Sequence, residues 1–430
     1  MKLNDIAEFV TDKISSSSIS LDRYVTTDSL LQNRRGRETA QNLPPMPCAL
    51  THYRQGDVLV ANIRPYLKKV WFADSEGGCS SDVLVFRAKN GHYPSFLYTV
   101  LIQDAFFDYA MSGAKGSKMP RGDKDQIMRY ELPTFTSLEE ENIGNIMVDI
   151  MSKINVNRQI NDNLEAMAKQ LYDYWFVQFD FPNEEGKPYK SNGGAMVWNE
   201  KLKREIPQGL DTPKIGDIEK NIITGKTPSC ADEDNFGGDI PFVTIDDIRG
   251  NLFVFEAQRT LSTKGADSQE KKYLPIGSLS VSCIGTIGVM GFVARLAQTN
   301  QQINSIVFEH EYNKEFLYFS LKLYYENAKA KTGNVFANMS KEEFASIIVA
   351  YPPKQILQAF HNKVAPIFDS IKNNIEEINS LTKQRDELLP LLMNSQATVN
   401  YHLFVMQSRL SSYRRLHPFY VLLYTFCVSV

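Results

Sequence analysis

Residues 139–174, EEENIGNIMVDIMSKINVNRQINDNLEAMAKQLYDY, decide the fold of this chain. Their apolar side chains recur at alternating steps of four and three residues: Ile143, Met147, Ile150 and Ile154, and after the polar Asn157 the set Ile160, Leu164, Met167 and Leu171. This spacing puts the apolar side chains on one face of an α-helix. The stretch therefore predicts one long amphipathic helix.

A second stretch toward the other end of the chain carries a similar stripe: Leu357, Phe360, Val364, Ile367, Ile371, Ile375, Ile378, Leu381 and Leu388. Two such helices either pack as ordinary core helices or, because the repeat is about 3.5 residues, form a helix-to-helix seam. Pro366 lies within the second stripe and predicts a kink there or a helix start just before it.

The same series of landmarks precedes each helix: GDVLV at 56–60 and GSLSV at 277–281, Ser112-Gly113 and Thr332-Gly333, and Pro133 and either Pro352 or Pro353. The copies are offset by 221, 220 and 219 residues. A nearly constant offset indicates two copies of one unit. Each copy is an α/β domain of short strands and helices, followed by a long helix.

Residues 179–210 lie between the copies and are rich in Pro, Gly, Asn and charge, which is typical of a linker. We therefore expect the following organisation: a first domain at 1–138, a central long helix at 139–178, the linker at 179–210, a second domain at 211–353, a C-terminal long helix at 354–396, and an atypical tail at 397–430.

Charge and composition bound the function. The 47 Lys and Arg are balanced by 50 Asp and Glu, giving a net charge of −3, so a nucleic-acid surface would have to be local. The five cysteines form no CxxC pair, which favours neither a zinc site nor a disulfide framework. The longest apolar run, at 419–430, is too short for an ordinary membrane span. These features predict a cytoplasmic protein without a membrane partner.

Motifs that would carry catalysis are incomplete. Gly225-Lys-Thr resembles part of a phosphate-binding P-loop, but Lys220 stands where that loop needs a glycine. Tyr351-Pro-Pro lacks the Asn or Asp of an amino-methyltransferase motif. Asp180, Glu185 and Lys187 are of the types found in a magnesium-dependent nuclease site, and this stays a minor alternative.

A basic loop, SGAKGSKMPRGDK at 112–124, combines glycines with four cations. Glycine allows backbone N–H groups to approach phosphate closely, and lysine and arginine supply the charge. The loop is either a phosphate-binding element or a solvated surface turn.

Taken together, the motifs resemble the specificity subunits of Type I restriction–modification systems, over roughly residues 1–398. The resemblance rests on these landmarks: in the second half GKTP at 225–228, GGDIPFVT at 237–244, GTIG at 285–288, QTNQQ at 298–302 and TGN at 332–334; in the first half IRPY at 63–66, CSSDV at 79–83 and the basic loop; and RD at 385–386 before LLPLLM at 388–393. Residues 399–430 match nothing expected after the closing helix. We interpret this tail as sequence from outside the family.

The resemblance implies two target recognition domains joined by two long antiparallel helices that form a coiled-coil spacer. Each domain would read one half of a split sequence in double-stranded DNA. Methylation and ATP-driven cleavage would belong to partner subunits, which are modification subunits, expected in two copies, and restriction subunits. This chain would then be non-catalytic and hold no cofactor, with S-adenosylmethionine, ATP and Mg²⁺ bound by the partners.

The central helix would set the gap between the half-sites. About 36 residues at about 1.5 Å each make about 54 Å, which spans at most about 16 base-pair steps of about 3.4 Å.

Candidate DNA contacts follow from charge and hydrogen-bonding capacity. For phosphate we expect Lys68, Lys69, Lys115, Lys118, Arg121 and Lys124. For base edges we expect Arg64, Thr299, Asn300 and Gln301, although the polar turn at 299–302 could equally brace the fold. Two alternatives to DNA recognition stay open, a protein-interaction scaffold and the nuclease.

Overall fold

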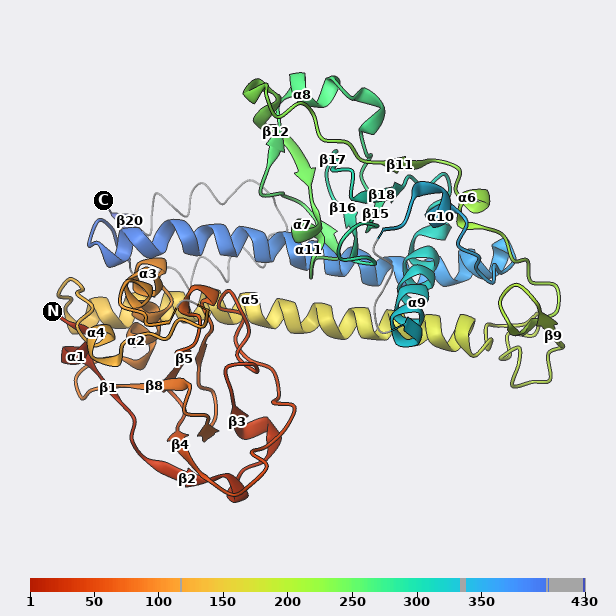
Figure 1. The fold of residues 1–430 in the computed structure, drawn as a ribbon. Helices are drawn as coiled ribbons and strands as arrows, with labels where there is room; N and C mark the ends of the chain where they lie inside the picture. Colours follow the sequence, from red (N-terminus) through yellow and green to blue (C-terminus); the bar gives the residue numbers. More distant parts are fainter. Residues whose placement is uncertain (117, 333–337, 400, 402–427, 430) are drawn as a thin grey trace. The chain divides into compact units, whose positions relative to one another are not determined.

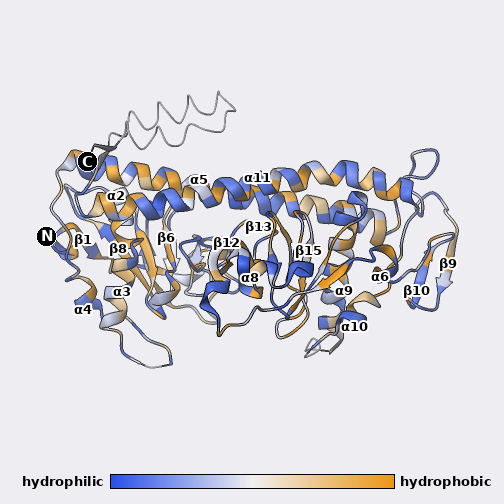
Figure 2. Cartoon of the chain, turned by 90° about the horizontal axis from the view of Figure 1, so that it is seen from above, coloured by the Kyte–Doolittle hydropathy of each residue, from blue (hydrophilic) through white to orange (hydrophobic). Residues whose placement is uncertain are grey.

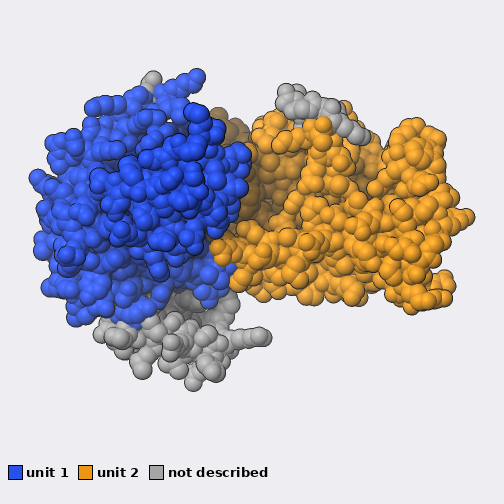
Figure 3. Space-filling view, turned by 90° about the horizontal axis from the view of Figure 1, so that it is seen from below, with its two compact units in different colours: residues 1–157, 377–430 blue, residues 158–376 orange. Residues whose placement is uncertain are grey.

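The computed structural model describes residues 1–116, 118–332, 338–399, 401 and 428–429. Contacts divide the chain into two compact units, coloured separately in Figure 3. Unit 1 comprises residues 1–157 and 377–430, and unit 2 comprises residues 158–376. The division falls inside both long helices, so it does not test the predicted domain boundaries, which stay a prediction.

The two stripes form the two longest helices, α5 (Ser137–Tyr172) and α11 (Lys354–Met393), drawn in yellow and blue in Figure 1. Within each unit they run antiparallel. In unit 1 the Arg385 guanidinium reaches Met151, and Asn157 donates to Glu377. In unit 2 Asn374 donates to Asn161, and the Tyr172 and Phe360 rings meet. The predicted fold class, α/β with long antiparallel helices, is confirmed.

Pro366 neither starts α11 nor ends it, so the predicted start just before Pro366 is wrong. The helix begins at Lys354 and continues through the proline. A proline removes one backbone donor. Val364 and Phe368, on either side of it, are buried in the core of unit 2, and burial of this apolar face offsets the lost bond.

Hydropathy follows the burial of these helices. Figure 2 shows α5 and α11 alternating between hydrophobic and hydrophilic residues along their length. The apolar residues of α5 at 143–154 belong to the main core of unit 1, and Ala168 and Tyr172 belong to that of unit 2. Among the described residues, no helix has both the length and the apolar composition of a membrane span.

Unit 1 contains two small sheets and a two-stranded pair of β19 (Thr398–Val399) and β20 (Val428–Ser429). The first has the order β1-β8-β5-β6 and is antiparallel throughout; the second has the order β2-β4-β7-β3 with a parallel β3–β7 pair. The strands are β1 (Ala7–Phe9), β2 (Lys13–Ser15), β3 (Tyr24–Val25), β4 (Ala49–Tyr53), β5 (Val58–Ala61), β6 (Val70–Phe72), β7 (Gly77–Cys79) and β8 (Val83–Ala88). The helices are α1 (Leu3–Ile6), η1 (Ser16–Ser18), η2 (Leu21–Arg23), η3 (Pro65–Leu67), α2 (Pro94–Leu101), α3 (Asp104–Ser112) and α4 (Lys124–Ile127).

Unit 2 repeats this plan with a five-stranded sheet, β11-β18-β15-β16-β13, and a three-stranded one, β14-β12-β17. The strands are β9 (Met196–Asn199), β10 (Arg204–Pro207), β11 (Ile222–Thr224), β12 (Phe236–Val243), β13 (Phe253–Val254), β14 (Thr260–Leu261), β15 (Leu279–Ser282), β16 (Met290–Val293), β17 (Gln298–Thr299) and β18 (Ile303–Ile306). The helices are η4 (Asp173–Val177), α6 (Ile215–Ile218), η5 (Glu233–Asn235), α7 (Ile245–Ile248), α8 (Thr263–Asp267), η6 (Glu270–Lys272), η7 (Glu311–Asn313), α9 (Lys314–Thr332) and α10 (Lys341–Ala345).

The pairing of the strands matches between the units. β5 lies between β8 and β6, as β15 lies between β18 and β16, and each follows a glycine with positive φ, Gly56 and Gly277. β7 pairs in parallel with β3, as β17 does with β12. Ser112 and Thr332 each end a helix, while Gly333 lies outside the described residues. The internal repeat is therefore a repeat of topology.

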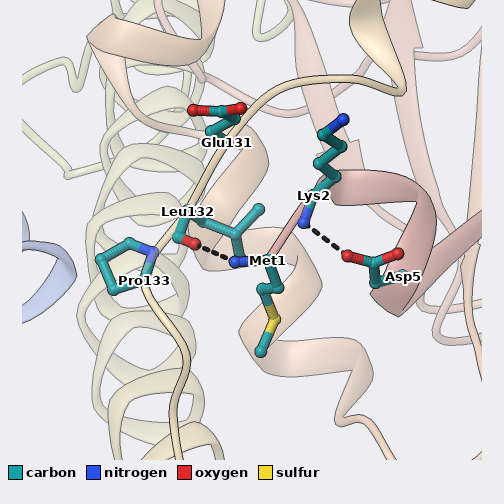
Figure 4. A pocket seen from close by; sticks show the side chains of 6 residues that line it. All are labelled: Met1, Lys2, Asp5, Glu131, Leu132 and Pro133. Carbon is teal, nitrogen blue, oxygen red and sulfur yellow. Dashed lines mark hydrogen bonds between the residues drawn. The ribbon is translucent and has the colours of Figure 1, made fainter.

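The N-terminal segment of each copy docks on the segment that precedes its long helix. Figure 4 shows the Met1 amino group donating to the Leu132 carbonyl oxygen (2.7 Å) and the Lys2 backbone N–H donating to the Asp5 carboxylate (2.6 Å). In unit 2 the Val349 N–H donates to the Pro213 carbonyl oxygen. Leu132 thus corresponds to Val349.

This correspondence corrects the third sequence landmark. It pairs Pro133 with Ala350, two residues before Pro352.

The segment expected as a linker is ordered. It contains the antiparallel β9–β10 hairpin, and Phe179 and Phe181 are buried in the core of unit 2. Most of the expected tail lies outside the described residues. Of the described part, Ala397 joins the core of unit 1, and the Tyr401 hydroxyl donates to the Asp149 carboxylate (2.8 Å).

Candidate nucleic-acid interface

Three loops of unit 1 meet beside the carboxyl end of β5. The first, Asn62–Lys68, joins β5 to β6, and Ile63 in it forms a backbone bridge with Arg121. The Arg64 N–H donates to the Pro120 carbonyl oxygen (2.8 Å). The Asn62 N–H donates to the Asp82 carbonyl oxygen (2.8 Å), on the loop between β7 and β8. The fold thus brings Arg64 next to the basic loop that contains Lys115 and Arg121.

The charges of this loop cluster are only partly compensated. Lys115 pairs with Asp123 (3.1 Å), Arg121 pairs with Asp82 (3.1 Å), and Lys68 shares the Asp104 carboxylate with Arg34. Lys69 donates to the Thr27 carbonyl oxygen. Arg64, Lys118 and Lys124 make no ion pair with any residue that the structure describes. Free cations therefore remain for an anion.

Proton equilibria in the cluster follow from this arrangement. Burial opposes ionisation of Asp104, but hydrogen bonds and charge from Lys68 and Arg34 outweigh it and lower the pKa of its carboxyl group. The Gln126 backbone N–H and Lys115 likewise lower the pKa of Asp123. Burial lowers the pKa of Lys69, and the nearby positive charge of Arg64 acts in the same direction. The acids stay ionised and hold the lysines in place.

A second polar cluster, in unit 2, forms between the motifs at 225–228 and 298–302. The Lys226 N–H donates to the Thr299 carbonyl oxygen (2.9 Å), and the Thr227 hydroxyl donates to the Gln301 side-chain oxygen (2.7 Å). A Cβ atom at Gly225 would overlap the Asn300 carbonyl oxygen, so this close packing requires glycine. The two motifs therefore form one structure.

The three residues predicted here differ in accessibility. Thr299 is fully buried in β17, whereas Asn300 is half-buried and Gln301 is exposed. The Asn300 side-chain amide donates to the Gln302 oxygen (3.0 Å). Only Asn300 and Gln301 reach the surface, so a base contact in unit 2 would rest on them, with Thr299 as internal support.

Sequence reasoning missed a buried polar network behind this cluster. The Gln269 side-chain amide donates to the Gln298 oxygen (2.6 Å) and to the Lys226 carbonyl oxygen (2.8 Å), and Lys272 donates to the Thr224 carbonyl oxygen (2.9 Å). Gln298 lies within a quoted motif, but no local pattern marks Gln269 or Lys272. The network fixes the backbone that carries the surface residues.

Unpaired polar atoms gather at the same two places. In the described part of the chain, four buried side-chain nitrogen or oxygen atoms lack a hydrogen-bond partner: Asn62 Oδ1, Arg64 Nε, Gln269 Oε1 and Thr299 Oγ1. Buried polar groups are nearly always paired, and exceptions occur where a ligand or water completes them. Two belong to each cluster.

The residues of the nuclease alternative are engaged elsewhere. The Asp180 carboxylate accepts hydrogen bonds from the Ser191 hydroxyl (2.6 Å) and N–H (2.7 Å), which lower its pKa, and Glu185 pairs with Lys187 (2.9 Å) on the surface. Within the described ranges, no three His, Cys, Asp or Glu side chains gather as a metal site.

The chain resembles known proteins in sequence and in fold. Residues 207–385 match the family described as the Type I restriction modification DNA specificity domain. The chain is 28% identical to the Type I restriction enzyme HindI specificity subunit of Haemophilus influenzae, over 92% of this chain and 98% of that protein. It is 23% identical to the MjaIX specificity subunit of Methanocaldococcus jannaschii, over 85% of this chain and 83% of that protein.

Both relatives are specificity subunits of Type I restriction enzymes, and this chain resembles them over most of its length. A solved S subunit of a Type I restriction–modification system from M. genitalium has the same fold, with a TM-score of 0.57 at 14% identity, covering 91% of this chain and 95% of that one. In this chain, the matched range 207–385 includes the whole polar cluster of unit 2 and much of α11.

Proposed function

We propose that the chain recognises a split double-stranded DNA sequence as the specificity subunit of a Type I restriction–modification complex. One observation carries the proposal: each unit holds a polar loop cluster with unpaired buried polar atoms, and the cluster of unit 1 also holds free cations. Two similar but differently equipped clusters suit two different half-sites.

The cluster of unit 1 has groups for both tasks of DNA binding, and the cluster of unit 2 has groups for base edges. Lys115, Lys118, Arg121 and Lys124 surround a glycine-containing loop and would bind phosphate, which positions the duplex without reading its sequence. Arg64 in unit 1, and Asn300 and Gln301 in unit 2, carry the donors and acceptors that distinguish base edges in the major groove.

Catalysis belongs to partner subunits in this proposal. Two modification subunits, one for each copy of the repeat, would supply S-adenosylmethionine-dependent methylation, and restriction subunits would bind ATP and Mg²⁺ for cleavage. This chain is non-catalytic, acts in the cytoplasm and holds no cofactor of its own.

A surface of α5 is suited to a protein partner. In unit 2, Ile160, Met167 and Tyr174 lie seven residues apart, and their exposed fractions are 41%, 57% and 38%. A heptad spacing places them on one face of the helix, and aligned exposed apolar side chains mark interaction sites.

The decisive experiment maps methylated adenines across the genome of cells that express this chain with its modification subunit. The comparison is with cells lacking only this chain. We expect a two-part motif that disappears with the chain. An unchanged methylation pattern, with the chain expressed and folded, would contradict the proposal.

A further inference from the structure

The loop Asn62–Lys68 of unit 1 holds two cationic residues in a backbone conformation that normally requires glycine. Arg64 has φ +52° and Lys68 has φ +51°, both in the left-handed region. A side chain there is strained, and such strain persists where the surrounding structure enforces it, often at functional sites.

Unit 2 has glycine at the corresponding positions. The Ala61 N–H donates to the Lys69 carbonyl oxygen, as the Ser282 N–H does to the Val289 carbonyl oxygen, so the two loops begin and end alike. Ile63 and Ile284 each form an isolated backbone bridge, with Arg121 and Asn338.

Counting from these anchors, Arg64 matches Gly285 (φ +79°) and Lys68 matches Gly288 (φ +84°). The backbone turn thus needs no side chain at either position. The 283–288 loop contains no lysine or arginine at all.

The surroundings of Arg64 suit an external acceptor. Its Nε atom is buried without a hydrogen-bond partner, and so is Asn62 Oδ1 two residues earlier. No carboxylate in the described part of the chain pairs with its guanidinium, while Lys68 is held by Asp104. Lys115 and Arg121, joined by an isolated backbone bridge, add two cations that pair with Asp123 and Asp82. A strained, unneutralised arginine among other cations is arranged for a ligand rather than for the fold.

Building on the proposed function, we propose that Arg64 is the specificity-determining residue of unit 1 and reads a guanine in its half-site. A guanidinium donates two parallel hydrogen bonds to guanine O6 and N7, the commonest sequence-specific contact of arginine in the major groove. Lys68, anchored on Asp104, closes the loop and holds its shape. Unit 2, whose loop carries glycines instead, reads its half-site through Asn300 and Gln301.

Arg64→Gly tests this directly, because glycine is the residue that the backbone conformation favours. The variant chain is expressed with its modification subunit, and methylated adenines are mapped genome-wide. We expect the motif to lose one guanine requirement in one half, with the other half and the gap unchanged. Binding of the complex to duplexes that differ only at that base should change from about 5- to 150-fold discrimination to none.

Three further variants serve as controls. Arg64→Lys keeps the charge but loses the paired geometry, so it should relax the same base. Lys118→Ala, a phosphate contact, should weaken binding to all sequences equally. Gly285→Arg places a guanidinium at the matching position of unit 2 and should alter only the other half-site. Among the described residues only Gln302 lies within 4 Å of a Cβ atom there, and the φ of +79° strains a side chain as it does at Arg64.

Outcomes separate this inference from the proposed function. If both Arg64→Gly and Arg64→Lys gave the wild-type methylation motif, the proposed role of Arg64 would be overturned. The proposed function of the chain as a specificity subunit would stand. Relaxation at a base other than guanine would overturn the guanine assignment. If Arg64→Gly prevented assembly with the modification subunit, while Arg64→Lys assembled and kept the wild-type motif, Arg64 would be structural.

Discussion

His361 on α11 and Glu315 on α9 connect the long helix of unit 2 to its domain by a hydrogen bond of 2.7 Å. Unit 1 has a similar His–Glu pair, but here the glutamate is on the long helix. Glu140 of α5 lies 2.9 Å from the ring of His92, which precedes α2. Both glutamates are buried, at 4% and 2% exposure. Each pair therefore attaches a helix to its domain through a carboxylate that needs its partner.

The pair in unit 2 makes stability depend on pH. The hydrogen bond that the His361 ring donates to Glu315 raises the pKa of His361 above 6.5. The charges of Glu315 and Glu311 act in the same direction, and burial and Lys314 oppose them. A raised pKa means that the folded state favours the protonated ring. The contribution of this pair to the stability of the folded state is fully present below about pH 6.5. It is lost as pH rises through the raised pKa of His361.

We expect His361→Gln to lower the free energy of unfolding by about 1–3 kcal/mol at pH 6 and by less at pH 9, because it leaves Glu315 without a charged partner. Thermal unfolding at both pH values measures this. His310→Gln, at an exposed histidine of the same unit, is the control and should show no such difference. Equal losses at both pH values would contradict the ion-pair explanation.

At the scale of elements, the long helices combine apolar packing with a few buried polar contacts. Asn157 is 4% exposed and donates to Glu377 (2.8 Å), which also pairs with Lys153 (2.9 Å). In unit 2 Asn374 donates to Asn161 (2.8 Å). Polar residues within a helix seam fix its register, because a shift would leave them buried and unpaired. Asn157, which interrupts the apolar stripe, therefore helps to fix the register of the two helices.

The outer face of α5 gives the prediction at this scale. Met167→Glu places a charge in the exposed apolar stripe, and we expect it to weaken association with the modification subunit tenfold or more, since a buried interface charge without a partner costs about 2 kcal/mol or more. Co-purification and titration measure the effect. Ala166→Glu adds the same charge at an exposed position of α5 that lies about 100° around the helix, and it should leave association unchanged. Equal binding by both variants would exclude this face.

At the scale of the whole molecule, a net charge of −3 means that attraction to DNA comes from local clusters. The affinity of the assembled complex for its target should fall steeply with salt, because each phosphate contact releases a counterion. Lys118→Ala should reduce the slope of log affinity against log salt by about 0.9 without changing the preferred sequence. Affinity independent of salt would instead favour the protein-interaction scaffold.

The sequence by itself determined the two long helices and the duplicated plan. Apolar periodicity is a local property, and Ile143, Met147, Ile150 and Ile154 can be buried on one side only as a helix. In the second set Leu164 and Leu171 pack against the core of unit 2, whereas Ile160 and Met167 are exposed. The glycines before β5 and β15 likewise mark turns by their own conformational freedom. The predicted helix start at Pro366 is wrong because burial of Val364 and Phe368 in the core stabilises the helix by more than one lost backbone hydrogen bond costs.

Only the tertiary structure decided the composition of the two loop clusters. Arg64 meets Pro120 across more than fifty residues of chain, and its left-handed backbone carries no sequence signal, since such turns are normally marked by glycine. Thr299 is internal because β17 pairs in parallel with β12, which no local pattern reveals. Contacts between distant loops depend on how sheets pair in three dimensions, whereas helices depend on neighbours along the chain.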